Sequence, residues 1–377
     1  MEGRLADSDR SVMRPVNLGS NKEQPMRHFI LTAWVLAAAC FMAGTAIPSR
    51  PVLAQSPRLD RAAWIGVTVM PKLDAVVKVG NVVVDSSENH TLSLPWIVQD
   101  VNGGWLYVGE ATKGWVKRSQ VCTLDEAPAY YTKVLAEAAL VSDEEELRVL
   151  NLRAMTWEEK GDLDRAIADY GEAIEFAPST VGYTNRGIAW SKKKEYDKAI
   201  ADFDQAIQLD PTNGFAYNNR GVDWKNKREY DKAIADFTQA IRLNPKDSYA
   251  YKNRGWVWHL KKEYDKALLD YQHSLELDPN NSLAYDSSAW LRATCPEARY
   301  RDGERAVINA TKACELTGWT DVNNISTLAA AYAESGDFDA AIKYQQQTID
   351  LDPNDAEFVK EANERIAQYR EKKPYRY

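Results

Sequence analysis

Histidine and cysteine, the residue types most often used in metal sites and covalent catalysis, are sparse in this chain. The four histidines are His28, His90, His259 and His273, and no two of them have the spacing of a zinc motif. No glycine-rich phosphate loop and no serine in a nucleophile elbow occur in the sequence. We therefore predict a protein that is not an enzyme, with no catalytic residue, metal ligand or cofactor site.

The cysteines beyond the N-terminal segment are Cys122, Cys295 and Cys314. Three cysteines in a chain of this length do not make a disulfide framework. Cys295 and Cys314 could pair in an oxidising compartment, or they could be two separately buried thiols. The sequence leaves both alternatives open.

Arginine and aspartate recur together at a fixed spacing, with an acid 16 residues after the arginine. Where the arginine is replaced, by Ser288 or Leu328, the acid is replaced too, by Asn309 or Tyr344. This joint change predicts contact, and a guanidinium that is partly buried needs a bidentate carboxylate. We expect a structural clamp between helices, in which Arg220 binds either Asp236 or the preceding Asp202. The predicted clamp residues are Arg153 with Asp169, Arg186 with Asp202, Arg220 with Asp236 and Arg254 with Asp270.

The sequence around these Arg–Asp pairs repeats with a period of 34 residues. Proline recurs at 211, 245 and 279, glycine at 187, 221 and 255, and tyrosine at 183, 217, 251 and 285. A fixed period of this length indicates stacked units that bury their apolar faces against their neighbours. We expect Gly221 and Ala233 to allow close helix approach, and the tryptophans at 157, 190, 224 and 258 to form a core ladder.

Within one period the order is Tyr217, Arg220-Gly221, Trp224, Ala233, Phe237 and Pro245. This pattern strongly resembles the tetratricopeptide repeat, which implies a pair of antiparallel helices per unit, stacked into a right-handed superhelix. The predicted fold class is therefore mainly α. The predicted units are 147–179, 180–213, 214–247, 248–281, 282–317 and 322–355, preceded by a linker helix at 128–146 and followed by a capping helix and tail at 356–377.

The resemblance also implies where a partner would bind, because the inner face of the first helix of each unit lines a concave groove. Such a groove suits an extended peptide or a short helix. Trp256 and Trp290 either face this groove or pack between units. The ninth unit positions hold Ile188, Val222 and Trp256 where a carboxylate clamp would need Asn, so we do not expect binding of a chaperone's C-terminal carboxylate. The groove residues are predicted as Thr184, Ile188, Ser191, Lys192, Phe215, Asn218, Val222, Lys225, Asn226, Tyr249, Lys252, Trp256, His259, Leu260, Leu283, Asp286 and Trp290.

Residues 60–127 differ in composition from the repeats, because they contain short segments rich in β-branched and aromatic residues. Five strands are expected, and Asn102-Gly103 between two of them favours a tight hairpin turn. The segment at 113–121, with Gly114-Trp115-Val116, resembles the closing strand of a bacterial SH3-like barrel. That resemblance implies either a structural spacer or a module that recognises peptides or cell-wall glycans.

The first 54 residues form a distinct segment, in which an uncharged stretch from Phe29 to Ile47 is followed by Val52-Leu53-Ala54. It predicts an export signal cleaved after Ala54, or an uncleaved membrane anchor. Without residues 1–54 the chain keeps 41 basic and 51 acidic residues, so its net charge moves from −8 to −10. An acidic chain disfavours nucleic-acid binding.

We therefore expect an exported or anchored adaptor of the bacterial periplasm or cell envelope, whose helical groove binds a protein or peptide. The alternative is a cell-envelope protein in which the β module recognises cell-wall material while the helical array is a spacer. The membrane is expected to be contacted only through an uncleaved N-terminal segment.

Overall fold

The computed structural model describes residues 64–65, 67–72, 75–79, 82–85, 96–102, 105–108, 114–137 and 142–377. The predicted leader at 1–54 lies outside the described residues. The described chain divides into two compact parts, residues 64–193 (the N-terminal part) and residues 194–377 (the C-terminal part), and each is described by itself. Among the described residues, no helix is both long enough and apolar enough to cross a membrane.

The N-terminal part begins with an antiparallel sheet in the order β3-β2-β6-β5-β4-β1-β7. Apolar side chains from alternate strand positions, including Val69, Trp96, Leu106 and Val116, form its core. The strands are β1 (Thr68–Pro71), β2 (Val76–Val79), β3 (Val82–Asp85), β4 (Trp96–Asn102), β5 (Trp105–Val108), β6 (Gly114–Lys117) and β7 (Val121–Thr123).

The described sheet has seven strands and not the five that were predicted, because two of the expected segments are each divided between two strands. The β2–β3 ladder closes at Val79 opposite Val82, so only two residues separate those strands. A 3-10 helix, η1 (Arg118–Gln120), interrupts the other segment between β6 and β7. The β4–β5 ladder closes at Asn102 opposite Trp105, as a hairpin requires, and the residues of its turn lie outside the described chain.

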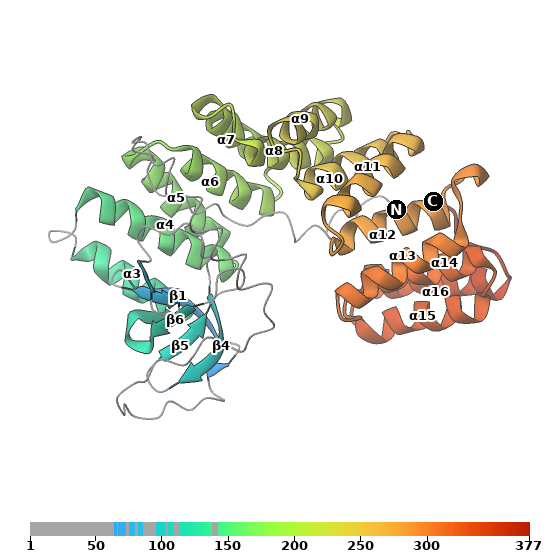
Figure 1. The fold of residues 1–377 in the computed structure, drawn as a ribbon, viewed down its shortest axis with the longest axis horizontal. Helices are drawn as coiled ribbons and strands as arrows, with labels where there is room; N and C mark the ends of the chain where they lie inside the picture. Colours follow the sequence, from blue (N-terminus) through green and yellow to red (C-terminus); the bar gives the residue numbers. More distant parts are fainter. Residues whose placement is uncertain are drawn as a thin grey trace. The chain divides into compact units, whose positions relative to one another are not determined.

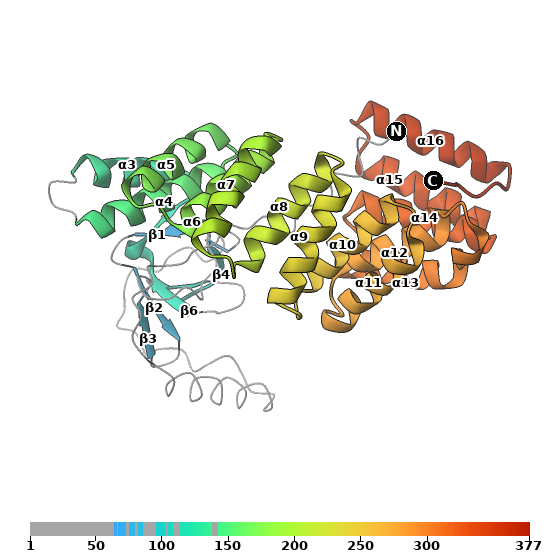
Figure 2. The same ribbon diagram turned by 90° about the horizontal axis from the view of Figure 1, so that it is seen from above.

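All remaining elements are helices, which follow one another as packed neighbours within each part (Figure 1). The N-terminal part contains α3 (Ala127–Ala136), α4 (Asp143–Glu159), α5 (Leu163–Phe176) and α6 (Thr180–Lys192). The C-terminal part contains α7 (Tyr196–Leu209), α8 (Gly214–Asn226), α9 (Tyr230–Leu243), α10 (Ser248–Leu260), α11 (Tyr264–Leu277), α12 (Ser282–Thr294), α13 (Gly303–Leu316), α14 (Val322–Ser335), α15 (Phe338–Leu351) and α16 (Ala356–Arg370). Figure 2 shows α8 and α9 side by side, as one helix pair of the array.

Helix α4 begins four residues before the expected start of the first unit, because Ser142 caps it. The Ser142 side chain accepts a hydrogen bond from the Glu145 N–H, and the Glu145 carboxylate accepts one from the Ser142 N–H. The expected linker helix at 128–146 is therefore replaced by α3 and the beginning of α4. Helix α3 is joined to the sheet by Tyr131, whose hydroxyl donates to the Pro71 carbonyl at 2.5 Å.

Close approach within a helix pair depends on the periodic glycines. A Cβ built on Gly221 would lie 2.8 Å from the Phe237 ring, and one built on Gly255 would lie 2.9 Å from the Tyr271 ring. Both rings are fully buried. These two positions therefore require glycine because an aromatic ring on the second helix fills the space of a side chain.

The periodic tryptophans lie at the edge of the core and not inside it, with Trp157, Trp224 and Trp258 packed against buried apolar clusters. Trp157, Trp190, Trp224 and Trp258 are only partly buried. Cationic side chains cover their exposed faces, as when Lys232 Nζ lies 4.3 Å from the ring centroid of Trp224 and Lys266 Nζ 4.4 Å from that of Trp258. An indole at the edge of a helix pair keeps one face toward solvent, which favours cation–π contact.

The arginine clamps join the two helices of one unit. Arg220 Nε and Nη2 donate to the two carboxylate oxygens of Asp236 at 2.8 and 2.7 Å. Arg153 binds Asp169 in the same bidentate way, and Arg254 binds Asp270. Of the two alternatives that the spacing allowed, the own-unit acid is the partner in these three clamps. The fourth predicted clamp would join Arg186 of the N-terminal part to Asp202 of the C-terminal part, and it stays a prediction.

Each of these clamps has a third contact with a preceding helix. Arg220 Nη1 donates to Asp204 of α7 at 2.6 Å, and Arg254 Nη1 donates to Thr238 of α9 at 3.2 Å. The guanidinium therefore ties one helix pair to the helix before it.

Where the arginine and its acid are both replaced, the two new side chains share a hydrogen bond or one apolar cluster. The Asn309 amide donates to the Ser288 hydroxyl at 3.2 Å, and Leu328 and Tyr344 belong to one apolar cluster. The joint change along the sequence thus reflects spatial contact.

Candidate functional site

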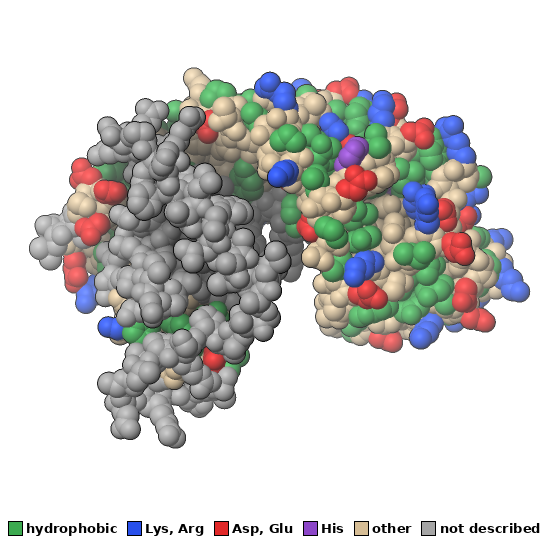
Figure 3. Space-filling model, in the orientation of Figure 1, with side chains coloured by type: hydrophobic (Ala, Val, Ile, Leu, Met, Phe, Trp, Pro, Cys, Tyr) green, Lys and Arg blue, Asp and Glu red, His purple; other side chains and the backbone are tan. Residues whose placement is uncertain are grey.

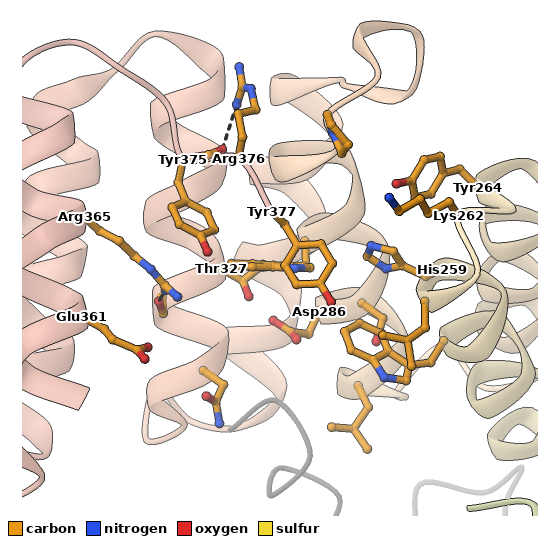
Figure 4. Close-up of a pocket in the computed structure, with 18 of the residues that line it drawn as sticks. His259, Lys262, Tyr264, Asp286, Thr327, Glu361, Arg365, Tyr375, Arg376 and Tyr377 are labelled. Atoms are coloured by element: carbon orange, nitrogen blue, oxygen red, sulfur yellow. Dashed lines mark hydrogen bonds between the residues drawn. The ribbon is translucent and has the colours of Figure 1, made fainter. Parts of the chain in front are cut away.

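A pocket of about 540 Å³ lies in the C-terminal part, lined by α10, α12, α14 and α16 (Figure 4). Its walls combine aromatic rings with charged and amide side chains, as peptide sites do. Eight of the predicted groove residues line it: Lys225, Lys252, Trp256, His259, Leu260, Leu283, Asp286 and Trp290. The inner faces of α10, α12 and α14, each the first helix of its unit, therefore meet at one site. Residues three or four apart lie on the same face of a helix, which is why these positions point the same way.

Side-chain caps fix where the lining helices begin. Asp247 accepts from the backbone N–H groups of Tyr249 and Ala250 at the start of α10. Asn281 does the same for Ala284 at the start of α12, and Asp321 for Asn324 at the start of α14. Because each cap satisfies backbone donors that the helix leaves unpaired, the three helices start at defined residues and present their lining residues in register.

An aromatic cluster forms one wall of the pocket around His259. The His259 ring is nearly fully buried, with its centroid 5.1 Å from that of Trp256 and 5.8 Å from that of Tyr264. Burial lowers the pKa of His259 to about 4, so the ring is neutral at pH 7. Its Nδ1 atom and Trp290 Nε1 have no hydrogen-bond partner in the described chain.

A carboxylate forms the floor of the pocket at Asp286. Burial raises the pKa of Asp286 to about 7, although a hydrogen bond from Thr327 and the charge of Lys252 act in the opposite direction. Its Oδ1 atom is buried and has no hydrogen-bond partner within the described residues. Thus the pocket offers a buried acceptor that a hydrogen-bond donor or a cation on a ligand could satisfy.

The burial of His259 predicts a loss of stability at acidic pH. Because the folded-state pKa is below the ordinary value of 6.5, the unfolded chain takes up a proton first, and stability falls as the pH drops from about 6.5 towards 4. Over that range the free energy of unfolding, relative to a His259→Gln variant, is expected to decrease by about 3 kcal/mol. Urea unfolding of both proteins at pH 7 and pH 4 measures this difference, and an unchanged difference would show that His259 is not the titrating group.

Several predicted groove residues are buried between helices and not open to a groove. Thr184, Ile188, Ser191, Asn218 and Val222 are buried. For Asn218 the reason is that the inner face of α8 is also its contact with α10, where the Asn253 amide donates to Asn218 at 3.1 Å. Whether any of the five contacts a partner stays a prediction.

Of the other predicted groove residues outside the pocket, Lys192 is exposed and three are half-buried. Lys192 lies in the N-terminal part, where its ammonium pairs with the buried Glu158 at 2.7 Å. Phe215, Asn226 and Tyr249 are half-buried on α8 and α10. Their role in partner binding also stays a prediction.

Sequence reasoning did not find the wall that α14, α16 and the following tail build. Ser326 and Thr327 come from α14, and the Arg365 guanidinium of α16 donates to the Ser326 hydroxyl at 2.7 Å. Extending the groove positions to the last unit would have found Ser326. The sequence signal for the last segment was its two aromatic residues, Tyr375 and Tyr377, which stand among charged ones.

The candidate metal ligands and thiols of the described part of the chain lie apart from one another. No group of three or more His, Cys, Asp or Glu side chains is placed to hold a metal ion there. Cys122, Cys295 and Cys314 are buried free thiols, which agrees with the alternative of separate thiols. On the face shown in Figure 3, basic and acidic side chains alternate over the helices of the C-terminal part, without a patch of one sign.

Comparison with family models identifies the tetratricopeptide repeat in five segments. One model matches residues 181–213, 215–247 and 248–281, and a second matches residues 147–180 and 326–355. Residues 282–317 match neither model, although α12 and α13 form a packed helix pair there. A comparison with curated protein sequences finds no match.

Solved structures with similar folds include one that is named for this repeat. A tetratricopeptide repeat protein from Parabacteroides merdae is 15% identical, with a TM-score of 0.51 over 66% of this chain and 92% of that chain. PilW, a type IV pilus biogenesis factor, is 19% identical, with a TM-score of 0.50 over 57% of this chain and 97% of that one. A chain of the APC/C hetero-tetramer Cut9-Hcn1 is 21% identical, with a TM-score of 0.49 over 66% of this chain, and the match spans only 46% of its own length.

At these identities the similarity concerns the fold alone. Together with the helix pairs and their clamps, the matches show that this mainly helical chain, with its small N-terminal antiparallel sheet, contains tetratricopeptide repeats.

Proposed function

We propose that this protein is a non-enzymatic adaptor that holds an extended peptide or a short helix of a partner protein in the pocket of its C-terminal part. The observation that carries the proposal is the set of unsatisfied polar atoms among aromatic rings, namely Asp286 Oδ1, His259 Nδ1 and Trp290 Nε1. A buried polar atom without a partner is costly, and a bound peptide would supply the missing hydrogen bonds.

The walls suit a peptide better than a small metabolite. Lining residues come from α8 to α16, so the site extends along several helices, and the aromatic faces of Trp256 and Trp290 would pack on apolar side chains. Amide groups such as that of Asn323, which lines the pocket and is half-buried, could pair with a peptide backbone. The absence of Asn from the ninth unit positions argues against a carboxylate clamp, so we propose recognition of internal peptide segments.

Site-specific photo-crosslinking in cells that produce the protein tests this function. A photoreactive residue at Leu283, which lines the pocket, should crosslink a partner protein identifiable by mass spectrometry. The matched control is Leu269, which is 54% exposed on α11 outside the pocket and should give no such adduct. A partner captured equally at both leucines, or only at Ile97 on β4, would refute the proposed site.

For the sheet we propose an SH3-like module, as the sequence resemblance implies, because it is antiparallel and ends in a 3-10 helix followed by a short strand. Recognition of cell-wall glycan by this module is the less favoured alternative. Sugars stack on exposed aromatic rings, whereas Trp96, Trp105 and Trp115 are all buried. We therefore propose the helical pocket as the principal recognition site.

Export also belongs to the proposal. The leader at residues 1–54 supports export to the periplasm or cell envelope, either with cleavage after Ala54 or with retention as an anchor. N-terminal sequencing of the protein purified from its own cells distinguishes these outcomes. A mature N-terminus at residue 55 supports a cleaved signal, and an intact N-terminus in the cytosolic fraction contradicts export.

A further inference from the structure

The chain after α16 folds back onto the end of α12. Residues 371–377, here called the tail, leave α16 through Lys372, which has a positive φ of 56°. The Tyr377 N–H donates to the Thr294 carbonyl at 3.1 Å, and Arg376 Nη1 donates to the Ala293 carbonyl at 3.2 Å. The last carbonyls of a helix have no partner within it, so the tail occupies acceptors that α12 leaves open.

The arginine of the tail has a prepared acidic partner. Arg376 Nη2 lies 2.5 Å from Glu334 Oε2 at the end of α14, and Arg301 Nε donates to the other oxygen of Glu334 at 3.0 Å. The Glu334 side chain is only 14% exposed. A carboxylate that is partly buried between two guanidinium groups, beside the negative end of α12, is a site built for a cation.

The two tyrosines of the tail lie on the pocket's aromatic wall. The Tyr375 ring has its centroid 5.8 Å from that of Trp290, and the Arg365 guanidinium lies 4.7 Å from the centroid of Tyr375. The Tyr377 ring lies 5.7 Å from His259 and 6.4 Å from Trp290 between centroids. In Figure 4 this ring lies among His259, Asp286 and Thr327, inside the pocket.

We propose that the tail is a removable intramolecular ligand of the pocket, and that the partner peptide displaces it by presenting the same chemistry, a basic side chain between two aromatic ones. This inference rests on the proposed peptide-binding function. The acceptors that hold the tail belong to α12 and α14, so they remain available to a peptide in trans once the tail has left.

The tail has the properties of a displaceable segment. Tyr377 is 40% exposed, and within the described chain the Lys373 ammonium pairs with its neighbour Glu371, at 2.8 Å. A tethered segment competes at a high effective concentration, so it weakens binding of a free peptide without blocking it. The tail therefore sets a threshold affinity that a true partner must exceed.

Binding of a synthetic peptide tests the proposal. The probe is the fluorescein-labelled sequence EKKPYRY, residues 371–377, with an amidated C-terminus so that no terminal carboxylate contributes. Fluorescence anisotropy is measured with the full chain and with the full-length variant Tyr375→Ala/Arg376→Ala/Tyr377→Ala. The variant should bind the peptide at least about tenfold more tightly, because its pocket has no tethered competitor.

Two controls give the test its specificity. Lys373→Ala alters the same tail outside the pocket and should bind the peptide as weakly as the unchanged chain. Adding Glu334→Gln to the triple variant should weaken peptide binding by about tenfold, since the cation loses its carboxylate.

Two results would overturn the inference, and a third would bear on the proposed function instead. Equal peptide binding by the triple variant and the full chain, or binding by neither, would show that the tail does not compete for the pocket. Loss of helical circular dichroism in the triple variant would show that the tail is required for folding and is not a displaceable ligand. Peptide binding without a partner crosslink at Leu283 would instead refute the proposed function and leave the tail inference standing.

Discussion

Replacing Asp270 by alanine is expected to lower the free energy of unfolding by about 3–5 kcal/mol, the cost of leaving one partner of a buried ion pair uncompensated. Asp270 is almost fully buried and accepts two hydrogen bonds from Arg254, at 2.8 Å each. These hydrogen bonds raise the pKa of Arg254. Because a guanidinium is protonated at neutral pH even without such a partner, Arg254 stays charged when Asp270 is removed. Urea unfolding followed by circular dichroism measures the loss.

The matched variant is Asp236→Ala in the preceding unit. Its arginine, Arg220, keeps a second carboxylate from Asp204, whereas Arg254 has only the hydroxyl of Thr238. Since Asp204 is half exposed, we expect it to reduce the loss by about 1 kcal/mol. The double variant Arg254→Ala/Asp270→Ala should recover part of the stability lost by Asp270→Ala. Equal losses for the two single variants together with strict additivity in the double variant would refute the clamp.

Replacing Gly303 by alanine is expected to cost about 3 kcal/mol, near the upper end of overpacking effects. A Cβ at this first residue of α13 would lie 2.6 Å from the Ser335 nitrogen and 2.9 Å from the Glu334 carbonyl carbon. Both are backbone atoms, which cannot turn aside as a side chain can, so α13 and the end of α14 would have to separate. Thermal or urea unfolding measures the effect.

The same substitution at Gly171 should have the opposite sign. A Cβ there would meet only the Arg186 guanidinium at 3.6 Å, an ordinary contact, and Gly171 lies inside α5. Alanine in a helix interior is favoured over glycine by about 0.5–1 kcal/mol, so Gly171→Ala should stabilise the protein. Destabilisation by Gly171→Ala, or none by Gly303→Ala, would contradict the packing described here.

Most of the helical fold could be predicted from the sequence, because stacked repeats require the same residues at the same places. The periodic glycines mark where Phe237 and Tyr271 pack, and the 16-residue spacing finds the clamps. The spacing could not decide between the own-unit acid and the preceding one, since both lie on helices that flank the arginine. The bidentate hydrogen bonds to Asp236 and Asp270 settle it. The third contacts could not be predicted either, because Asp204 and Thr238 differ in type and no repeated residue marks them.

Only part of the lining of the pocket could be predicted from the sequence. Positions on α10 and α12 follow from the helical period, but the same period also selects residues such as Ile188 and Val222 that pack between helices. Burial depends on how closely neighbouring first helices approach, which a single sequence does not state. The tail was expected only as part of a polar cap, because a charged segment beyond the last repeat usually faces solvent.

Hydrogen exchange of the full chain, measured by mass spectrometry with and without the partner captured at Leu283, tests the central claim most directly. Binding in the pocket should slow exchange in α10, α12 and α16 and speed it in residues 374–377, because the partner replaces the tail. Slowed exchange confined to the strands of the sheet, with α10, α12, α16 and the tail unchanged, would contradict the account.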